Sequence, residues 1–309
     1  MAHSKESEPR AHHYVPKCWL AGFTDTGGKD GRLWVTDLRR AKQWPSSPPN
    51  AGHSRDFYRI SEPGFDPVAA EKFYSKIEGE IAPLLRNLNQ EKRSPAKDEM
   101  ESLCIFMALQ WSRVPAFRPK VLDVAYKINR ANMARALRNP ASWRRVLKRL
   151  NVPFDSPEAD YDRMREFVES EQYSLSGDNE WYIQQGIESA TTIAPSLQKR
   201  HWHAYVSQKG SFIASDNPVV LDGGKKEMVG FANAEVVVYP LNRHVVLCGA
   251  RLDVTPVTLS EILIARLNTL MMLTAHEQVF SWKSDFCWLD HSEHYQTDWR
   301  LFEKDRFPI

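Results

Sequence analysis

Long apolar runs and paired cysteines are absent from this sequence of 309 residues. No unbroken apolar stretch approaches the roughly 18 residues that a membrane-spanning helix needs, and the opening residues lack the apolar segment of a signal peptide. The four cysteines include no C-x-x-C pair, which argues against a zinc ribbon and against a thioredoxin-type redox motif. We therefore expect a cytoplasmic protein with reduced cysteines and no membrane partner.

Four common catalytic signatures are missing as well. The sequence contains no G-x-x-x-x-G-K-[ST], no G-x-G-x-x-G, no H-E-x-x-H and no G-x-S-x-G. Their absence argues against P-loop nucleotide hydrolysis, standard dinucleotide binding, zincin chemistry and the usual hydrolase nucleophile elbow.

The composition is that of a soluble globular protein, with 42% apolar and 26% charged residues, but its net charge of +2 hides a segregation. Residues 118–149 hold ten basic side chains and one acid, whereas residues 155–188 hold ten acids and two arginines. Two interpretations stay open. The two segments neutralise each other, or residues 118–149 gather nucleic acid or another polyanion.

Periodicity divides the chain into a helical middle and parts that contain strands. Apolar residues at three- and four-residue steps predict helices at 67–90, 95–114, 119–138, 141–149, 158–173, 179–199 and 258–275. Alternation predicts strands at 32–38, 201–207, 210–215, 235–241 and 244–250, with a breaker-rich loop at 43–54.

These elements predict an α+β fold in which a helical middle region packs on a C-terminal, mainly antiparallel sheet. We expect residues 12–309 to form a single compact domain, with a helical subregion at 67–200 and a sheet-bearing subregion at 201–290. Residues 1–11 are polar and are expected to form a tail.

Two adjacent imidazoles, His12 and His13, come just before Tyr14 and Pro16. Neighbouring side chains point to opposite sides of an extended backbone, so we expect one histidine to enter a site while the other faces water. Surface histidines with no function are the competing interpretation.

Polar residues also stand where the predicted helix at 95–114 faces the core. Its apolar stripe includes Phe106 and Met107, and continuing it by three- and four-residue steps reaches Gln110 and Arg113. A buried guanidinium needs a carboxylate, a carbonyl or a ligand anion to offset its desolvation. An internal salt bridge and an anion-binding arginine are both compatible with this position.

A predicted strand leads into Ser215-Asp216-Asn217-Pro218. Pro218 keeps Asn217 out of the helical region, so Asp216 is expected at a strand end or in a sharp turn. A carboxylate held on a rigid strand suits catalysis, whereas an Asx-turn that caps loop backbone explains the same residue equally well.

A series of short motifs runs along the chain in a fixed order. They are H-x-Y-V-P from His12 or His13 with Trp19, Leu20 and Phe23, then Asp56-Phe57-Tyr58, Ile77-Glu78, Gln110-x-x-Arg113-x-Pro115, Ser215-Asp216-Asn217-Pro218, Asn268 and Val279-Phe280-Ser281. This ordered set resembles the bacterial domain of unknown function numbered 4238, with Cys18 as a departure from an expected aromatic or hydrophobic residue. The resemblance implies one compact unit with a shared site and implies no activity.

Our leading hypothesis is an enzyme that acts on a phosphate-containing or nucleic-acid substrate, such as a nuclease that hydrolyses phosphodiester bonds. His12 or His13 would be the general acid–base, Arg113 the phosphate or oxyanion clamp, Gln110 an orienting group, and Asp216 a base or orienter. The alternative is a non-catalytic module that binds nucleic acid or a partner, with a structural buried Arg/Asp network. An acyl or sugar substrate stays open, because arginine also binds carboxylates.

Further residues complete the leading hypothesis. The predicted substrate contacts are Tyr14, Asn217, Arg130, Arg138, Arg144 and Arg145. Glu78 could join Asp216 around a divalent metal ion, and the cofactor is otherwise unknown from the sequence. The sequence gives no prediction of the oligomeric state. An enzyme should bring a histidine, Arg113 and Asp216 into one pocket, whereas a scaffold should bury Arg113 in a closed salt bridge.

Overall fold

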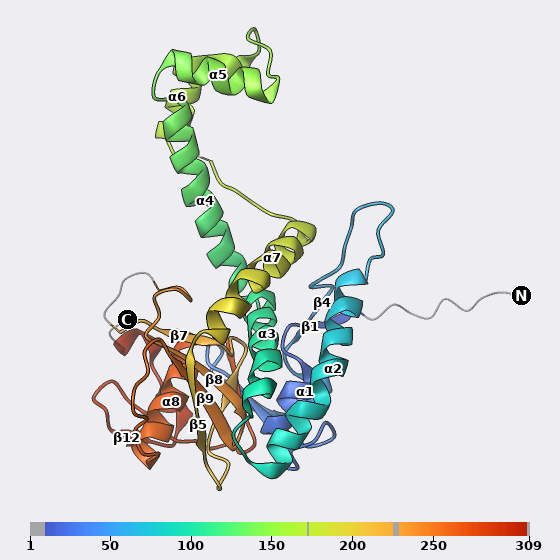
Figure 1. Ribbon diagram of the computed structural model, residues 1–309, viewed down its shortest axis with the longest axis vertical. Coiled ribbons are helices and arrows are strands. Elements are labelled where there is room, and N and C mark those ends of the chain that lie inside the picture. The colour runs from blue at the N-terminus through green and yellow to red at the C-terminus, as the bar shows by residue number, and fades with distance from the viewer. Residues whose placement is uncertain (1–9, 172, 225–228, 308–309) are drawn as a thin grey trace, which may run out of the picture. The chain divides into compact units, whose positions relative to one another are not determined.

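The computed structural model describes residues 10–171, 173–224 and 229–307. The chain divides into two compact units, which we call unit 1, up to Phe117 and from Asn179 onward, and unit 2, Arg118–Asp178. The α+β class is confirmed (Figure 1). The single domain at 12–309 stays a prediction, and residues 1–9 of the predicted tail lie outside the described residues.

The N-terminal part of unit 1 contains more strand than we predicted. Its elements are β1 (Ala11–His13), α1 (Lys17–Leu20), a 3-10 helix (Ala21–Phe23), β2 (Leu33–Asp37), β3 (Lys42–Ser46), a 3-10 helix (Pro48–Asn50) and β4 (His53–Arg55). The predicted loop at 43–54 is therefore wrong, since β3 pairs with β2 and β4 pairs with β1. Pro45 is compatible with β3 because β3 is an edge strand. The backbone groups on the outer edge of such a strand need no hydrogen-bond partner from another strand.

Among the described residues of unit 1, four α-helices are longer than two turns, namely α2 (Ala69–Glu91), α3 (Lys97–Arg113), α7 (Asn179–Gln198) and α8 (Glu261–Thr274). α3 begins two residues later than predicted, because the Glu99 carboxylate accepts a hydrogen bond from the Ala96 amide at 2.7 Å and closes the first turn there. α3 packs closely along α7. A side chain at Gly186 would bring its Cβ to 2.9 Å from the Ser112 carbonyl oxygen, so glycine permits this approach.

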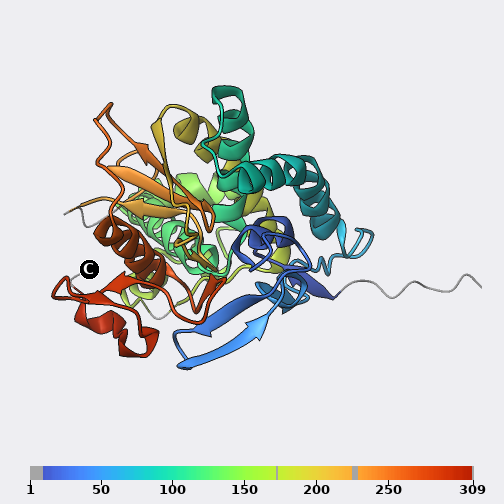
Figure 2. The ribbon, with the colours of Figure 1, turned by 90° about the horizontal axis from the view of Figure 1, so that it is seen from below.

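The described residues of unit 1 also form two four-stranded antiparallel sheets. The first has the order β5 (His201–Val206), β9 (Val245–Ala250), β8 (Val236–Asn242) and β7 (Val220–Asp222), which confirms the C-terminal sheet. The second has the order β3, β2, β10 (Gln278–Ser281) and β6 (Ala214–Ser215), so it joins the N-terminal hairpin to the C-terminal part (blue and red in Figure 2). The predicted strand at 210–215 is reduced to its last two residues.

The remaining C-terminal elements of unit 1 are short. They are β11 (Trp288–Leu289), which pairs with β12 (Tyr295–Gln296), and two 3-10 helices (Trp299–Leu301 and Lys304–Arg306). Among the described residues, no helix combines the length and the apolar character needed to cross a bilayer.

Unit 2 is helical. It contains α4 (Phe117–Ala136), which starts at the last residue of unit 1, α5 (Pro140–Leu150), a 3-10 helix (Pro157–Ala159) and α6 (Tyr161–Glu169). Asn139 caps α5 by accepting from the Ser142 amide at 2.8 Å. Leu137, Trp143 and Leu147 form its buried cluster. The helical middle is thus confirmed, because the described residues between 67 and 200 contain no strand.

Candidate functional site

Arg113, the last residue of α3, is buried and faces α2 and β1. One of its terminal nitrogens, Nη2, donates to Glu78 Oε1 at 2.8 Å and to the His13 carbonyl oxygen at 2.6 Å. Its guanidinium carbon lies 4.5 Å from the centre of the Tyr74 ring, a cation–π contact. The Tyr58 hydroxyl donates to the Arg113 carbonyl oxygen. The predicted internal salt bridge is present, and its carboxylate is Glu78.

The face of α2 that meets Arg113 carries a second carboxylate, Glu71, two turns before Glu78. The seven-residue spacing places both side chains on one side of the helix. Burial raises the pKa of Glu71, although Arg113 and His12 act in the opposite direction. Glu71 Oε2 is buried and makes no hydrogen bond to the part of the chain that the structure describes. We did not predict Glu71, and its spacing from Glu78 was the only signal.

The buried face of α2 carries Tyr74, Ile81, Leu85 and Leu88, whereas neighbouring Phe73 is 39% exposed. Tyr74 therefore reaches the Arg113 guanidinium.

Both predicted histidines lie beside Arg113, and both are buried. His12 Nδ1 accepts from the Tyr58 amide at 2.9 Å, and its ring stacks on the Tyr58 ring. His13 Nε2 lies 3.1 Å from the Pro49 carbonyl oxygen, with the His53 ring beside it. The expectation that one histidine faces water is wrong, because Tyr58 covers one side of β1 and His53 with Pro49 covers the other. Burial lowers the pKa of His13 to about 4, so its ring is neutral at pH 7.

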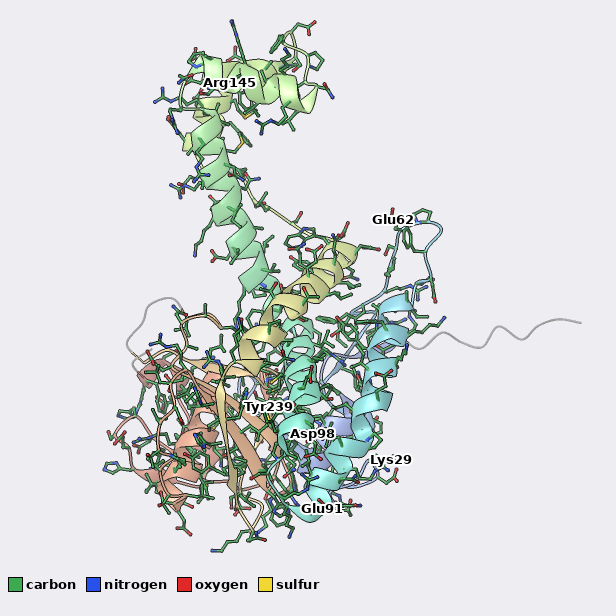
Figure 3. All side chains as sticks on the ribbon, in the orientation of Figure 1. Lys29, Glu62, Glu91, Asp98, Arg145 and Tyr239 are labelled. Atoms are coloured by element: carbon green, nitrogen blue, oxygen red, sulfur yellow. The ribbon has the colours of Figure 1, made fainter. Side chains whose placement is uncertain are left out.

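Gln110 lies one turn before Arg113 and is fully buried, as the stripe predicts. The Tyr239 hydroxyl lies near its side-chain amide, in the interior of unit 1 (Figure 3). Burial raises the pKa of Tyr239 well above its ordinary value. Within the described residues, neither amide atom of Gln110 makes a hydrogen bond of good geometry. Gln110 therefore belongs to the core behind Arg113.

Asp216 follows the end of β6, as predicted, but its carboxylate is directed at a turn. It accepts from the backbone amides of His276, Glu277 and Gln278 at 2.7, 2.8 and 2.9 Å. Burial raises the pKa of Asp216 to about 6, and these three amides oppose the shift. The structure thus does not join Asp216 to Arg113, and the backbone-capping interpretation describes its contacts. Neighbouring Asn217 donates to the Thr274 carbonyl oxygen at 2.8 Å and secures the same turn.

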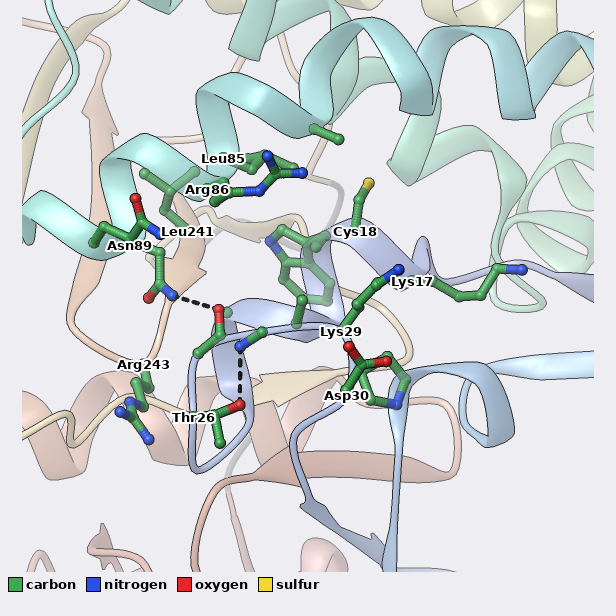
Figure 4. A pocket seen from close by; sticks show the side chains of 18 of the residues that line it. Lys17, Cys18, Thr26, Lys29, Asp30, Leu85, Arg86, Asn89, Leu241 and Arg243 are labelled. Carbon is green, nitrogen blue, oxygen red and sulfur yellow. Dashed lines mark hydrogen bonds between the residues drawn. The ribbon is translucent and has the colours of Figure 1, made fainter.

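A pocket of about 970 Å³ in unit 1 opens beside Glu78. Its walls come from α1, from the loop 26–30, from the α2 side chains between Glu78 and Lys92, and from residues 241–244 (Figure 4). The two walls are tied together where the Asn89 side-chain amide donates to the Gly27 carbonyl oxygen at 2.9 Å. Gly27 has a φ of +72°, and a Cβ there would lie 2.5 Å from Asn89 Nδ2, so glycine is required at this contact.

The pocket wall is basic. Four exposed cationic side chains line it, and within the described residues none of them has a carboxylate in salt-bridge range; they are Lys17, Lys29, Arg86 and Lys92. A fifth, Arg243, donates to the carbonyl oxygens of Thr24 and Asp25 instead. The carboxylates of the wall are Asp30 and Glu78. This excess of positive charge attracts anions.

A cysteine thiol, Cys18, also lines the pocket. Burial raises the pKa of Cys18 to about 12, so the reactive thiolate is scarce at neutral pH. Glu78 is the carboxylate of the wall that pairs with the buried Arg113.

A family model described as a protein of unknown function, DUF4238, matches residues 11–285. The chain belongs to the DUF4238 family. The resemblance drawn from the short motifs is therefore confirmed. No curated protein and no solved structure matches the chain. The residues of this DUF4238 chain that the family model matches include Glu78, Arg113 and Asp216.

The other predicted site residues of this DUF4238 chain are divided between the two units. Tyr14 and Asn217 are buried in unit 1, and burial raises the pKa of the Tyr14 hydroxyl. Arg130 pairs with Glu171 in unit 2. Arg138, Arg144 and Arg145 are exposed residues of unit 2 (Figure 3 labels Arg145).

The two predicted metal ligands of the DUF4238 chain are committed to different partners. Glu78 is paired with Arg113, and Asp216 accepts from three backbone amides. Over the residues that the structure describes, no group of three or more His, Cys, Asp or Glu side chains is arranged to hold a metal ion.

Proposed function

We propose that this protein is an enzyme that hydrolyses a phosphodiester held in the unit 1 pocket, with Glu78 as the acid–base group. The observation that carries the proposal is the position of Glu78. Its carboxylate is fixed by the buried Arg113 and lines a pocket whose wall also carries four cations without acidic partners among the described residues.

The pocket suits a phosphate-containing ligand in charge and in size. Lys17, Lys29, Arg86 and Lys92 supply ammonium and guanidinium groups that bind phosphoryl oxygens. Its volume lies at the upper end of the range of about 300–1,000 Å³ in which small-molecule and cofactor sites fall. A nucleotide-sized group is therefore accommodated.

The proposed reaction uses Glu78, a water molecule and the basic wall. The Glu78 carboxylate takes a proton from water as the water oxygen forms a bond to phosphorus. The phosphorus–oxygen ester bond breaks, and the leaving oxygen takes the proton back from Glu78. The products are a phosphate monoester and an alcohol, and the cationic side chains stabilise the negative charge that builds on the phosphoryl oxygens.

Arg113 and His13 are positioning residues in this proposal, and Gln110 is part of the core. Arg113 holds the Glu78 carboxylate, and the His13 carbonyl oxygen holds Arg113. This assignment differs from the sequence-based hypothesis, in which a histidine is the acid–base group. It is supported by the burial of both imidazole rings and by the pKa of His13 near 4. We also propose the cytoplasm as the place of action, in keeping with four free cysteine thiols.

A non-catalytic module that binds a phosphate-containing ligand is the second candidate. It is favoured by the closed salt bridge of Arg113 and by the capping contacts of Asp216, both of which stabilise the fold without any ligand. In that case the same basic wall binds the ligand, and Glu78 only secures Arg113.

The experiment compares two glutamates of α2. Hydrolysis of bis(p-nitrophenyl) phosphate and of short RNA and DNA oligonucleotides is measured with added Mg²⁺ and with EDTA. Glu78→Gln should lower kcat by about 100-fold or more. Glu80→Gln, an exposed residue of the same helix, should leave kcat unchanged.

Folding and ligand binding are checked separately in the same variants. Calorimetric titration with a nucleoside monophosphate should show binding to Glu78→Gln at near wild-type affinity and weakened binding to the double variant Lys17→Ala/Arg86→Ala. Glu78→Asp, which retains the carboxylate, should recover part of the activity. Binding without any hydrolysis by the wild-type protein supports the second candidate, and unchanged kcat in folded Glu78→Gln contradicts the first.

A further inference from the structure

α5 of unit 2 presents a basic surface without acidic partners. Four cationic side chains of this helix are exposed; they are Arg144, Arg145, Lys148 and Arg149. Arg145 donates to the Ser142 hydroxyl at 3.1 Å, and within the described residues none of the four has a carboxylate in salt-bridge range. Successive residues of a helix are separated by about 100°, so these four positions share an arc of about 140°.

The arrangement of these charges is unfavourable for the isolated helix. Arg144 with Lys148 and Arg145 with Arg149 are like-charged pairs at i and i+4, and such pairs destabilise a helix by a few tenths of a kcal/mol each. Salt bridges to the acidic residues of unit 2 would remove this repulsion. In α6, Glu169 forms a salt bridge with Arg165, and the other acidic side chains are exposed to solvent. The hypothesis that the acidic segment neutralises the basic one is therefore not supported for α5.

Most of the opposite face of α5 is covered. Trp143 and Leu147 are buried against Leu137 and side chains of α6, and Trp143 Nε1 donates to the Ala159 carbonyl oxygen at 3.0 Å. Leu150, at the end of this face, is 63% exposed. An amphipathic helix that lies in a membrane surface needs its whole apolar face for the lipid. On α5 that face is mostly packed against the protein, so the basic surface fits a polyanion in water better than an anionic bilayer.

An exposed aromatic ring stands just beyond the C-terminal end of α5. The helix ends at Asn151 in the left-handed conformation, with a φ of 54°. Phe154 follows in the next turn, is 64% exposed and makes no ring contact within the described residues. A bare aromatic ring next to a row of cations is the arrangement on which single-stranded nucleic acids bind, with phosphates on the cations and a base stacked on the ring.

We propose that α5 and Phe154 form a binding site for single-stranded nucleic acid. Arg144, Arg145, Lys148 and Arg149 bind successive phosphates, and Phe154 stacks on an unpaired base. The site contacts backbone and base faces and not base edges, so it discriminates little between sequences. The proposal also names single-stranded nucleic acid as the substrate class of the proposed hydrolysis. Only this assignment of the substrate rests on the proposed function.

Binding is measured by fluorescence anisotropy of the full chain with a labelled oligothymidine and a labelled oligouridine of 12–15 nucleotides. Four phosphate contacts on a single strand give a slope of log K against log salt of about −2.8, so affinity should fall about 50-fold between 50 and 200 mM salt. The double variant Arg145→Ala/Arg149→Ala should halve this slope. The control Lys127→Ala/Arg165→Ala removes the same charge from exposed, ion-paired positions of unit 2 and should keep the slope.

The ring is tested by two aromatic substitutions. Phe154→Ala should weaken single-strand binding about tenfold without changing the salt slope. Phe154→Trp, which keeps an aromatic ring, should bind the strands as the wild-type protein does. Phe167→Ala, at an exposed ring of α6 that stacks on Tyr173, is the matched control and should bind normally.

Four outcomes overturn this proposal. They are equal affinity for a duplex of the same length, preferential binding to phosphatidylserine vesicles, loss of binding in the Lys127→Ala/Arg165→Ala control, and no binding by the wild-type protein at 50 mM salt. Glu78→Gln should bind the strands as the wild-type protein does. Strand binding by a protein that hydrolyses nothing therefore supports this site while it contradicts the proposed hydrolysis.

Discussion

Arginine has two opposite environments in this molecule. In unit 1, Arg113 is buried, and its guanidinium meets a carboxylate, a backbone carbonyl and an aromatic face. In unit 2, Arg144 and Arg149 are exposed on α5 and have no carboxylate in salt-bridge range among the described residues. The fold supplies a carboxylate for Arg113, whereas among the described residues it supplies none for Arg144 or Arg149.

This difference separates a stabilising charge from one available for binding. A buried charge whose partner is removed leaves an uncompensated ion in the core, and the free energy of unfolding falls steeply. An exposed charge is solvated with or without a partner, so its removal changes stability little and changes long-range attraction of anions. Arg113 and the α5 arginines should therefore respond differently to the same substitution.

The largest expected effect is on the buried side. Arg113→Ala should lower the free energy of unfolding by about 3–5 kcal/mol, because Glu78 then lacks its cation. Urea denaturation followed by circular dichroism measures the change. Arg113→Ala/Glu78→Gln should recover part of the loss, since the unpaired carboxylate is gone. A loss below about 1 kcal/mol for Arg113→Ala would contradict the proposed role of the salt bridge.

A smaller effect concerns pH and His13, whose carbonyl oxygen Arg113 contacts. The pKa of His13 is near 4 in the folded protein and near 6.5 in an unfolded chain, so the unfolded state binds the proton first as pH falls. His13 therefore favours unfolding by about 2 kcal/mol when the pH drops from 7 to 5. The free energy of unfolding of His13→Gln should depend less on pH over this interval by that amount. Equal slopes for the two proteins would show that the ring is not buried in the neutral form.

The smallest expected effect is on the exposed side. Arg144→Ala and Arg149→Ala should each change the free energy of unfolding by less than about 0.5 kcal/mol. A slight stabilisation is expected, because each substitution removes a like-charged neighbour on α5. Urea denaturation of these variants beside Arg113→Ala tests the comparison directly. Destabilisation above about 1 kcal/mol would mean that these arginines have a structural partner.

The helices and the core-facing position of Arg113 could be predicted because they depend on local pattern. Apolar steps of three and four residues located each long helix, and Gln110 and Arg113 lie on the buried stripe of α3 as expected. The partner of Arg113 could not be predicted, because the sequence offers 39 Asp and Glu residues and only the crossing of α2 over α3 selects Glu78.

The strands and the Asp216 contacts show where local pattern fails. β3 contains Pro45, which normally argues against a strand, and only its edge position makes the proline harmless. β10 lies next to β2 from the other end of the sequence, a pairing that no window of neighbouring residues records. The Asp216 carboxylate accepts hydrogen bonds from the backbone amides of residues 276–278, which lie about 60 residues further along the chain.

The sheet that joins β2 to β10 has a consequence for biosynthesis. β2 is an inner strand, and the antiparallel partner on its second edge is β10, whose first residue, Gln278, pairs with Asp37. At a translation rate of 5–20 residues per second, about 240 residues of delay correspond to roughly 10–50 s in which the nascent hairpin carries an unpaired edge. An unpaired edge strand recruits other chains. Chaperone capture of ribosome-bound intermediates should therefore begin once β2 has left the exit tunnel and end only after β10 has followed it.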